Sequence, residues 1–312
     1  MEGEIEMVLV KIALPKGHLW DETKRLLDEA GYNLDLRDPR SYLAKTNDPE
    51  IQMRIHRAQN IGLLVEEGKY DLGITGLDWV TEPNACVELL MDLGYGKVDV
   101  VAAIPQRYGV STLGEASGDE VFKRFLKAVK AEGRNRVIVA SEYENLTKKL
   151  CEDKFSGFPY RIIRSYGATE TFIEVADMIV DCTETGRTLR ENGWEVVYKL
   201  FDSTARLIAC KESLKDPAKR TKIEGFMTII NGAREAEGLK LLKMNVPDSA
   251  FEGVIGVLPA MKSPTISRLY GSNGGYAVEV AVRQEQIVQL IPVLKSKGAT
   301  DIIELDIKKA IR

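Results

Sequence analysis

The chain has 312 residues, of which 44% are hydrophobic, and its formal net charge is −4. This length is enough for two or three domains with ample core, and the acidic balance excludes a general nucleic-acid binder. An anionic ligand would therefore need local donors rather than a basic surface. No apolar stretch is long enough to cross a membrane, and the acidic start Met1–Glu6 lacks the basic region of a secretory signal. We expect a cytoplasmic protein with no membrane partner.

Cysteine and histidine are too few and too scattered for most metal or thiol chemistry. The four cysteines, at positions 86, 151, 182 and 210, show no CxxC spacing, so a zinc site or a disulfide framework is not expected. Reduced and mostly buried thiols are the default. With two histidines in the chain, His-rich metal centres and most His-based catalytic triads lose support.

Strand-like and helix-like segments alternate over most of the chain, which predicts an α/β fold with a largely parallel sheet. In the first region we expect a strand at Val8–Leu14, a helix from Lys16-Gly17 to Gly31, a strand at Ile51–Ile55, a helix at Asn60–Glu67 and a short strand at Asp71–Gly76. A longer strand, Val98–Ile104, ends at Pro105 and begins a second α/β lobe.

The second lobe continues the same alternation. Its expected elements are a helix at Val121–Lys130, a strand at Arg136–Ala140, a helix at Glu142–Cys151, a strand at Tyr160–Arg164, a helix at Thr169–Val175 and a strand that leads into Asp181. Two such lobes form a cleft between the carboxyl ends of their strands, where ligands of α/β proteins usually bind.

Beyond Lys211 the pattern changes. After a long helix at Asp216–Glu237 we expect strand Lys240–Asn245, helix Pro247–Val257, strands Thr265–Leu269 and Tyr276–Val282, helix Gln284–Lys297 and strand Asp301–Leu305. This βαββαβ order is the ferredoxin-like, or ACT-like, arrangement. Such a domain can bind a regulatory ligand or serve for oligomerisation, and the pattern alone favours neither.

The segment Asp181–Leu189 is the clearest candidate for a ligand-binding site in the sequence. An apolar run, Met178–Val180, leads into a turn of acids and hydroxyls, and a short helical stretch then ends at Asn192-Gly193. Backbone N–H groups around Thr185, Gly186 and Arg187 would open the helix unpaired and can point at a phosphate, and Gly186 allows close approach. The carboxylates of Asp181 and Glu184 could hold ribose hydroxyls or a hydrated Mg²⁺. An ordinary capped strand-to-helix turn explains the same residues.

The chain as a whole resembles the long form of ATP phosphoribosyltransferase, the first enzyme of histidine biosynthesis. The resemblance covers nearly the whole chain and rests on four blocks in the family's order: Ile12–Gly17, Asp71–Asp78, Ala176–Asp181 running into Thr185–Leu189 and Asn192-Gly193, and Ser263–Thr265. It implies two lobes like a periplasmic binding protein, at 1–98 with 206–237 and at 99–205, and a regulatory domain at 238–312. It also implies a homo-oligomer, as dimer or hexamer.

The resemblance further implies a pentosyl transfer from phosphoribosyl pyrophosphate (PRPP) to N1 of ATP, with Mg²⁺ bound mainly through substrate phosphates. The implied site residues are Asp181 and Glu184 with Lys16 and Arg57 for catalysis; Asp181, Glu184, Thr185, Gly186, Arg187 and Thr188 for PRPP; Lys16, Asp71 and Leu72 for ATP; and Asn245, Met261 and Thr265 for histidine as inhibitor. Structural roles remain open for Lys16, as a strand-to-helix residue, and for Asp71, as the start of a strand.

Some positions depart from the family pattern. His18 stands where Arg is common, and Asn60-Ile-Gly62 stands where Asp-Ile-Pro is common, so we leave these positions out of the catalytic set. Asn245 replaces a common Asp, which predicts weaker histidine inhibition. Cys182 is expected to be a small filler rather than a thiolate, because Asp181 beside it would raise its pKa.

A solute-binding or effector-sensing module is the competing interpretation, because a two-lobed α/β cleft with Asp71–Gly76 also suits the capture of a small anion without chemistry. The absence of a signal sequence disfavours a secreted binder. No helix-turn-helix segment precedes the lobes to support a transcriptional sensor.

Overall fold

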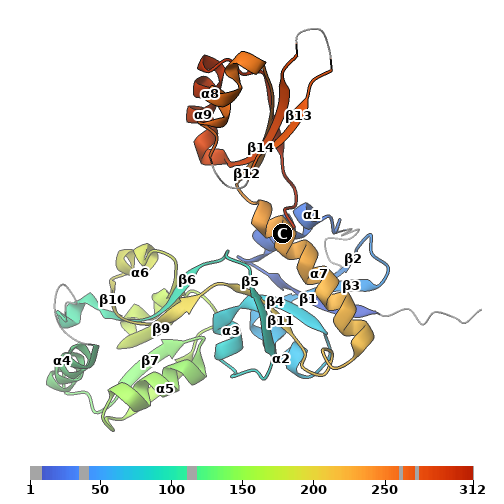
Figure 1. The fold of residues 1–312 in the computed structure, drawn as a ribbon. Helices are drawn as coiled ribbons and strands as arrows, with labels where there is room; N and C mark the ends of the chain where they lie inside the picture. The colour runs from blue at the N-terminus through green and yellow to red at the C-terminus, as the bar shows by residue number, and fades with distance from the viewer. Residues whose placement is uncertain (1–8, 35–41, 111–117, 260–262, 271–273, 312) are drawn as a thin grey trace, which may run out of the picture. The chain divides into compact units, whose positions relative to one another are not determined.

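The computed structural model describes residues 9–34, 42–110, 118–259, 263–270 and 274–311. By its internal contacts the chain divides into two units, one made of residues 1–23 and 35–220 and the other of residues 24–34 and 221–312. The first unit contains two β-sheets and the second contains one (Figure 1).

The first sheet has six strands, and its centre is parallel. Its order is β2 (Leu43–Lys45), β3 (Ile51–Arg57), β1 (Val10–Lys16), β4 (Leu72–Gly76), β11 (Ala205–Ala209) and β5 (Glu88–Asp92). Strands β3 and β4 run parallel to β1, whereas β2, β11 and β5 pair antiparallel with their neighbours. Helices α1 (Trp20–Ala30), α2 (Ala58–Glu66) and α3 (Leu77–Thr81) follow β1, β3 and β4 along the chain.

The second sheet has five strands and is buried on both faces. Its order is β10 (Trp194–Ser203), β6 (Val98–Pro105), β9 (Met178–Thr183), β7 (Val137–Ser141) and β8 (Tyr160–Arg164). One face packs on α4 (Gly118–Ala131) and α5 (Glu144–Lys154), and the other packs on the 3₁₀ helix η2 (Thr169–Glu174) and α6 (Arg187–Glu191). This double burial explains why its central strands are nearly continuous apolar runs.

Strand β9 shows how the alternation of side chains selects its polar residues. Met178 and Val180 pack into the core beneath α4 and α5, whereas Ile179 packs into the opposite core with Leu189 and Trp194. Because successive side chains point to opposite faces, Asp181 lies on the η2 and α6 face. Cys182 packs against the α4 and α5 core.

The carboxylate of Asp177, just before β9, is a structural anchor. It is fully buried and accepts hydrogen bonds from the Tyr108 hydroxyl (2.6 Å), the Ile138 N–H (2.9 Å) and the Arg134 guanidinium. A buried charge is tolerated when donors surround it in this way. The acidic residue of the Ala176–Asp181 block that holds the lobe together is therefore Asp177.

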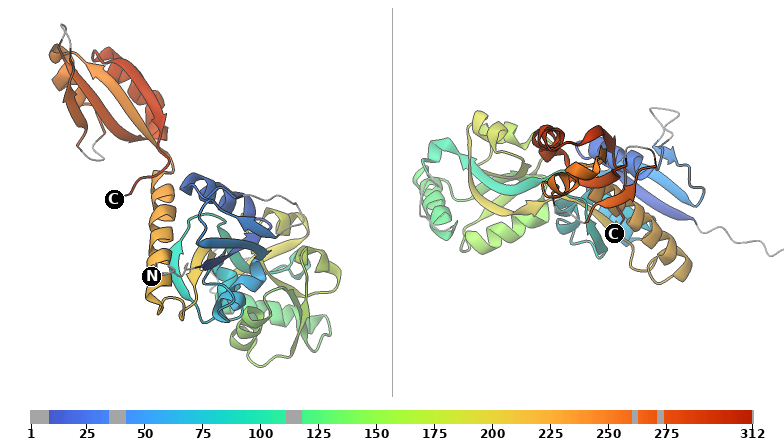
Figure 2. Two further views of the ribbon diagram at one scale, coloured as in Figure 1. Left: turned by 90° about the vertical axis from the view of Figure 1, so that its right-hand side faces the viewer. Right: turned by 45° about the horizontal axis from the view of Figure 1, so that its top comes forward.

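The second unit has the predicted βαββαβ order. Its sheet runs β13 (Thr265–Arg268), β14 (Tyr276–Arg283), β12 (Leu239–Val246) and β15 (Thr300–Asp306), which is the ferredoxin-like strand order. Helices α8 (Phe251–Ile255) and α9 (Gln284–Ser296) cover one face, over a core that includes Met244, Val278 and Leu294 (Figures 1 and 2). The long α7 (Pro217–Ala236) precedes β12.

The structure corrects several of the sequence-based elements. Both sheets of the first unit are mixed rather than largely parallel: β2 and β11 pair antiparallel with β3 and β4, and β6 pairs antiparallel with both β9 and β10. Strands β2, β5, β10 and β11 lie where no element was predicted. Register shifts at Val196/Tyr198 and Lys199/Phe201 interrupt the alternation of β10 and hide it from a period-2 pattern. Residues 169–174 form a 3₁₀ helix rather than an α-helix.

The cysteines differ in burial. All four are free thiols; Cys151 and Cys210 are buried, Cys182 is half-buried and Cys86 is exposed. Among the described residues, no group of three or more His, Cys, Asp or Glu side chains could hold a metal ion by itself. Within the same described ranges, no helix has both the length and the apolar character needed to cross a bilayer.

Gly73→Ala should destabilise the first unit by about 1–3 kcal/mol, because a Cβ atom on Gly73 would lie 2.5 Å from Ile61 Cγ2 and 2.9 Å from Val65 Cγ2. Gly225→Ala is the matched control, since it lies within α7 with open space around its Cβ position and should stabilise slightly. Urea unfolding measures both. Equal stability of the Gly73 variant and the wild type would contradict the packing of α2 on β4.

Candidate active site

Two cations lie together at the carboxyl edge of the first sheet. Lys16 ends β1 and Arg57 ends β3, and the parallel register pairs these two residues directly. Both side chains are exposed, and the Lys16 ammonium lies 5.2 Å from the centre of the Tyr42 ring. The fold therefore brings together two predicted site residues that lie far apart in sequence.

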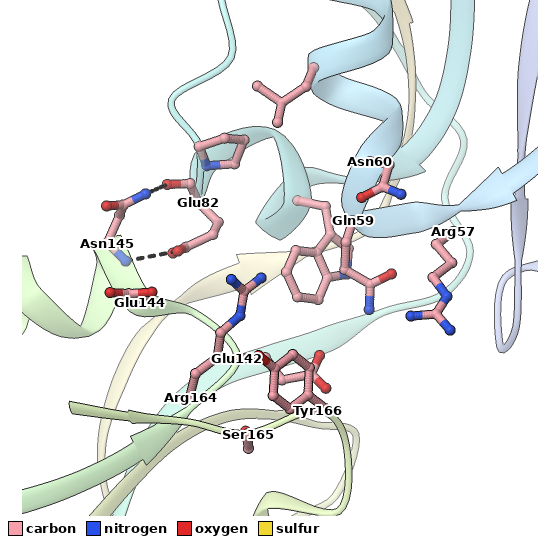
Figure 3. A pocket seen from close by; sticks show the side chains of 13 residues that line it. Arg57, Gln59, Asn60, Glu82, Glu142, Glu144, Asn145, Arg164, Ser165 and Tyr166 are labelled. Atoms are coloured by element: carbon pink, nitrogen blue, oxygen red, sulfur yellow. Dashed lines mark hydrogen bonds between the residues drawn. The ribbon is translucent and has the colours of Figure 1, made fainter.

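A first pocket, with a cavity volume of about 390 Å³, opens beside Arg57. One wall comes from α2 and the segment after α3, and the other comes from residues that follow β7 and β8 (Figure 3). The walls mix cations, carboxylates, amides and aromatic rings: Arg57, Gln59, Asn60, Trp79, Glu82 and Glu142, with Asn145, Arg164 and Tyr166. Such a lining suits a polar ligand that carries both a ring and charged groups.

The two walls of this pocket are joined by Glu82. Its carboxylate accepts hydrogen bonds from the backbone N–H groups of Asn145 (2.7 Å) and Leu146 (3.0 Å) at the start of α5. The Asn145 side-chain amide donates in return to the Glu82 carbonyl (3.0 Å; Figure 3). A carboxylate at the N-terminus of a helix satisfies its free N–H groups and its dipole. This clamp fixes the spacing of the pocket walls.

A buried network lies beneath the clamp. Asp78 accepts hydrogen bonds from the hydroxyls of Tyr143 and Ser203, each at 2.7 Å. The Trp79 ring stacks on the Tyr143 ring at a centroid distance of 4.6 Å. Since Asp78 and Trp79 follow the first sheet and Tyr143 follows β7, the network adds a second connection between the lobes.

A second pocket, with a cavity volume of about 410 Å³, contains the predicted phosphate loop. Asp181, Glu184, Thr185 and Thr188 line it together with Cys182, Thr183, Glu170 and His18. The structure therefore collects the acids and hydroxyls of the loop around one cavity.

Asp181 is half-buried and near other carboxylates. Burial, together with the charges of Glu142 and Glu170, raises the pKa of its carboxyl group to about 6, although hydrogen bonds from the Cys182 N–H (2.7 Å) and from Thr169 act to lower it. Glu142 belongs to the first pocket and Glu170 to the second. Asp181 therefore lines the second pocket and is also affected by the charge of a carboxylate from the first.

The turn after Asp181 differs in detail from the expected set of free amides. Gly186 has a left-handed backbone (φ 68°), and its N–H donates to the Thr183 hydroxyl at 2.9 Å. The Arg190 guanidinium donates to the Thr185 carbonyl at 3.2 Å. In the described part of the chain no hydrogen bond is recorded for the N–H of Thr185 or Thr188, so these two amides remain candidate donors.

Cys182 and Arg187 lie at the margin of the site. Burial and the neighbouring Asp181 raise the pKa of the Cys182 thiol to about 12, which agrees with a neutral filler. Arg187 is exposed and pairs with Glu191 at 2.7 Å along α6.

Asp71 and Leu72 lie at the amino end of β4, whereas Lys16 and Arg57 lie at the carboxyl ends of β1 and β3. The two ends are separated by five residues of strand, about 16 Å. The Asp71 carboxylate accepts hydrogen bonds from the Lys11 N–H (2.8 Å), Ser213 (2.6 Å) and Lys219 (2.7 Å). These bonds lower the pKa of Asp71 although burial acts to raise it. The structure does not bring Asp71 and Leu72 together with the two cations.

Comparison with known proteins decides the family. A family model described as ATP phosphoribosyltransferase matches residues 57–232, and one described as HisG, C-terminal domain, matches residues 236–309. The chain belongs to the ATP phosphoribosyltransferase family. A relative of that name from Pelotomaculum thermopropionicum is 36% identical over 97% of this chain and 99% of its own length, and one from Chlorobium phaeovibrioides is 37% identical over 97% and 98%.

A solved structure supports the same fold. The ATP phosphoribosyl transferase (HisG:HisZ) complex from Thermotoga maritima superposes with a TM-score of 0.57 at 24% identity, covering 72% of this chain and 97% of that chain. The family models and the relatives confirm the resemblance inferred from the four sequence blocks, and the C-terminal domain marks the long form of the family.

The positions that depart from the family pattern have different surroundings. His18 lines the second pocket and Asn60 lines the first. Gly62 is buried, and a Cβ atom there would lie 3.1 Å from the Trp79 carbonyl oxygen. Gly62 therefore allows α2 to pack closely on α3.

Sequence reasoning missed several pocket residues, namely Trp79, Glu82, Glu142, Asn145, Arg164, Tyr166 and Glu170. Glu142 directly follows β7, and Arg164 ends β8. The rule that ligands bind beyond the carboxyl ends of parallel strands could have found these two.

In the ferredoxin-like domain, Asn245 and Thr265 lie on the same sheet face, opposite the helices. Asn245 pairs with Ala277, and Ala277 pairs with Ser267, so these three residues lie on one face. Thr265 lies two residues before Ser267 on the same strand and therefore shares that face. The Asn245 amide donates to the Asp301 carboxylate at 2.9 Å. Met261 lies outside the described residues.

Asp181→Asn should raise the free energy of unfolding at pH 8 by about 2–3 kcal/mol. The folded-state pKa of Asp181 lies above the ordinary Asp value, so ionisation of this group destabilises the folded protein. That destabilisation develops as the pH rises from about 4 through about 6. The gain should therefore be smaller at pH 5. Urea unfolding of the substrate-free protein at both pH values measures it.

Asp177→Asn is the matched control, because its buried carboxylate has three donors. The Asp177→Asn substitution should lower the free energy of unfolding by about 2–3 kcal/mol. An Asp181→Asn variant less stable than the wild type at pH 8 would contradict a strained carboxylate.

Proposed function

We propose that this protein catalyses the first step of histidine biosynthesis, in which the 5-phosphoribosyl group of PRPP is transferred to N1 of ATP. The products are N1-(5-phosphoribosyl)-ATP and pyrophosphate. The observation that carries the proposal is the pair of pockets in the first unit, one lined by Asp181 and the hydroxyl-rich loop and one lined by cations and aromatic rings. Family membership supports it.

PRPP occupies the second pocket in this proposal. Its 5′-phosphate is bound by the turn at Thr185–Thr188 through the free amides, the threonine hydroxyls and the Arg187 charge, with Gly186 allowing close approach. Asp181 accepts hydrogen bonds from the ribose hydroxyls. Glu184, which is exposed on the same pocket, is a second acceptor for ribose. Each charge-assisted hydrogen bond supplies about 1.5–3 kcal/mol.

ATP occupies the first pocket, with Lys16 and Arg57 directed to its triphosphate or to the pyrophosphate of PRPP. The shared carboxyl edge and the exposure of both cations support this role. Asp71 and Leu72 are replaced in the ATP site by residues of the first pocket, because their end of β4 lies about 16 Å from the cations. Asp71 serves instead to hold Ser213 and Lys219.

The transfer requires the protein to position the two substrates and to stabilise charge, and it requires no covalent bond between the protein and the ribose. As the bond between C1′ and the pyrophosphate oxygen breaks, the ribose gains oxocarbenium-like positive charge, and the N1 lone pair of adenine forms the new bond. An ionised Asp181 beside the ribose stabilises that charge, and the cations receive the negative charge of the leaving group. The neutral Cys182 thiol takes no part.

Mg²⁺ fits this donor set as a substrate-bound ion. The described residues contain no cluster of three metal-ligating side chains, and Mg²⁺ typically binds through substrate phosphates with one or two carboxylates and water. Glu170, Asp181 and Glu184 line the second pocket and could hold its hydration shell. When bound, the ion would neutralise charge on the departing pyrophosphate.

Histidine is the proposed feedback inhibitor, bound at the C-terminal domain around Asn245, Met261 and Thr265 in a homo-oligomer, as dimer or hexamer. The carboxylate of Asp301 beside Asn245 supports recognition of an ammonium group, because it supplies the negative charge that Asn245 lacks. A cytoplasmic location accompanies the proposal, since ATP and PRPP are made inside cells.

The test is turnover of purified protein with ATP, PRPP and Mg²⁺, followed by the absorbance of phosphoribosyl-ATP and by pyrophosphate release. Arg57→Gln should lower kcat/KM by about 10- to 150-fold through loss of a charge-assisted contact. Arg54→Gln, exposed on the same strand, is the control and should behave as wild type. Millimolar histidine should slow the wild-type reaction.

Ligand binding without turnover by folded protein would favour the solute-binding alternative. An unchanged rate with histidine, together with unchanged sedimentation, would remove the regulatory role without affecting the catalytic one.

A further inference from the structure

Tyr166 is an aromatic side chain left in solvent at the rim of the first pocket. It is 86% exposed, although it follows β8 directly after Arg164 and Ser165, and it lines the cavity. Large aromatic side chains normally bury most of their surface because hydration of the ring is unfavourable. An exposed ring on a pocket wall is therefore a candidate contact for a ligand.

The loop that carries Tyr166 is fixed at both ends. The Ser165 N–H donates to the Ser141 carbonyl at 3.0 Å, and the Ser165 and Thr169 hydroxyls are hydrogen-bonded at 2.8 Å. Gly167 (φ 103°) and Ala168 (φ 49°) both have positive φ angles. A non-glycine residue such as Ala168 pays a conformational cost in this region, which the surrounding bonds must offset. The backbone therefore presents Tyr166 in a defined direction.

One face of the ring already has a cationic neighbour. The Arg164 guanidinium lies 5.5 Å from the centre of the Tyr166 ring, within the range of a cation–π contact. Figure 3 shows Arg164, Glu142 and Tyr166 on the same wall of the pocket. The contact restrains the ring while most of its surface remains accessible.

Trp79, the other aromatic side chain of the pocket lining, is less suitable for stacking on a ligand. Its ring is stacked on Tyr143 with an interplanar angle of 22°, and the residue is only 8% exposed. Of the two aromatic side chains in this lining, Tyr166 is the one whose ring face is accessible to a ligand.

The Tyr166 loop also lies near the reacting end of the site. The Glu142 carboxylate lies 3.8 Å from the position of a Cβ atom on Gly167, and its charge acts on Asp181. Within the loop, the Ser165 hydroxyl is hydrogen-bonded to the Thr169 hydroxyl at 2.8 Å, and Thr169 donates a hydrogen bond to the Asp181 carboxylate assigned to the ribose. A planar group stacked on Tyr166 would be within reach of a ribose held at Asp181.

We infer that Tyr166 is the stacking platform for the adenine ring of ATP, with Arg164 restraining its side chain. This inference rests on the proposed function, and it assigns the residue that distinguishes a nucleotide with a planar base from other polyphosphates. Stacking of a base on an aromatic ring is tolerant of ring substituents, so the contact provides affinity for the base rather than a hydrogen-bond code. Tyr166 is a binding residue and takes no part in bond breaking.

Tyr166→Ala should raise the KM for ATP about tenfold while the KM for PRPP changes less than twofold. Tyr166→Phe should stay within twofold of wild type for both, because the ring is retained. Tyr270→Ala removes a tyrosine of the C-terminal domain that is even more exposed than Tyr166 and should change neither constant. Calorimetric titration of each variant with ATP alone, and with inorganic tripolyphosphate as the probe that lacks a base, separates base from phosphate binding.

In the calorimetry, Tyr166→Ala should weaken ATP about tenfold and leave tripolyphosphate unchanged. Equal ATP affinity in Tyr166→Ala and wild type, or an equal loss for tripolyphosphate, would overturn the inference. If the wild type binds ATP but lacks turnover, the proposed function is wrong. The titrations of the Tyr166 variants then still decide whether Tyr166 stacks on the base.

Discussion

The parallel register of β8, β7 and β9 determines where the reactive groups of this protein lie. Arg164 pairs with Ser141, and Ser141 pairs with Val180, so the residues that follow these last pairs emerge at one edge. The next residues along the chain are Ser165, Glu142 and Asp181. Three segments separated in sequence therefore supply a cation and an aromatic ring, a carboxylate, and the start of the phosphate loop. The opposing edge of the first sheet supplies Lys16 and Arg57 by the same rule.

This arrangement places several carboxylates close together, and their repulsion is unfavourable in the absence of a ligand. Asp181 is half-buried, and burial with the charges of Glu142 and Glu170 raises its pKa. Asp177, four residues earlier, is buried more completely, yet three donors surround it. The difference separates a carboxylate that stabilises the fold from one that is held ready for a ligand with hydroxyl groups or positive charge. The Glu82 clamp and the Asp78 network keep the two lobes in place around it.

Much of the fold could be predicted because local pattern was sufficient. Apolar runs of strand length, glycine-ended helices and the βαββαβ order required no long-range information. Residues 194–209 were missed because the bulges of β10 break the alternation on which strand prediction depends. Asp181–Leu189 was recognised from its local sequence, and the four blocks identified the family. Arg164 and Tyr166 look like the end of a strand and a turn, and only the register with β7 and β9 connects them to Asp181. Asp71 shows the reverse problem: it belongs to one of the four family blocks, but it directly precedes β4, so it lies at the edge of the sheet away from the cations.

The central claim is that the loop after Asp181 binds the phosphoribosyl group. Hydrogen–deuterium exchange with PRPP and Mg²⁺, in the absence of ATP, tests it most directly by reporting which backbone amides a ligand protects. The account predicts slower exchange in peptides that cover residues 181–191, with little change in the C-terminal domain. Calorimetrically measurable PRPP binding without protection of residues 181–191 would contradict it.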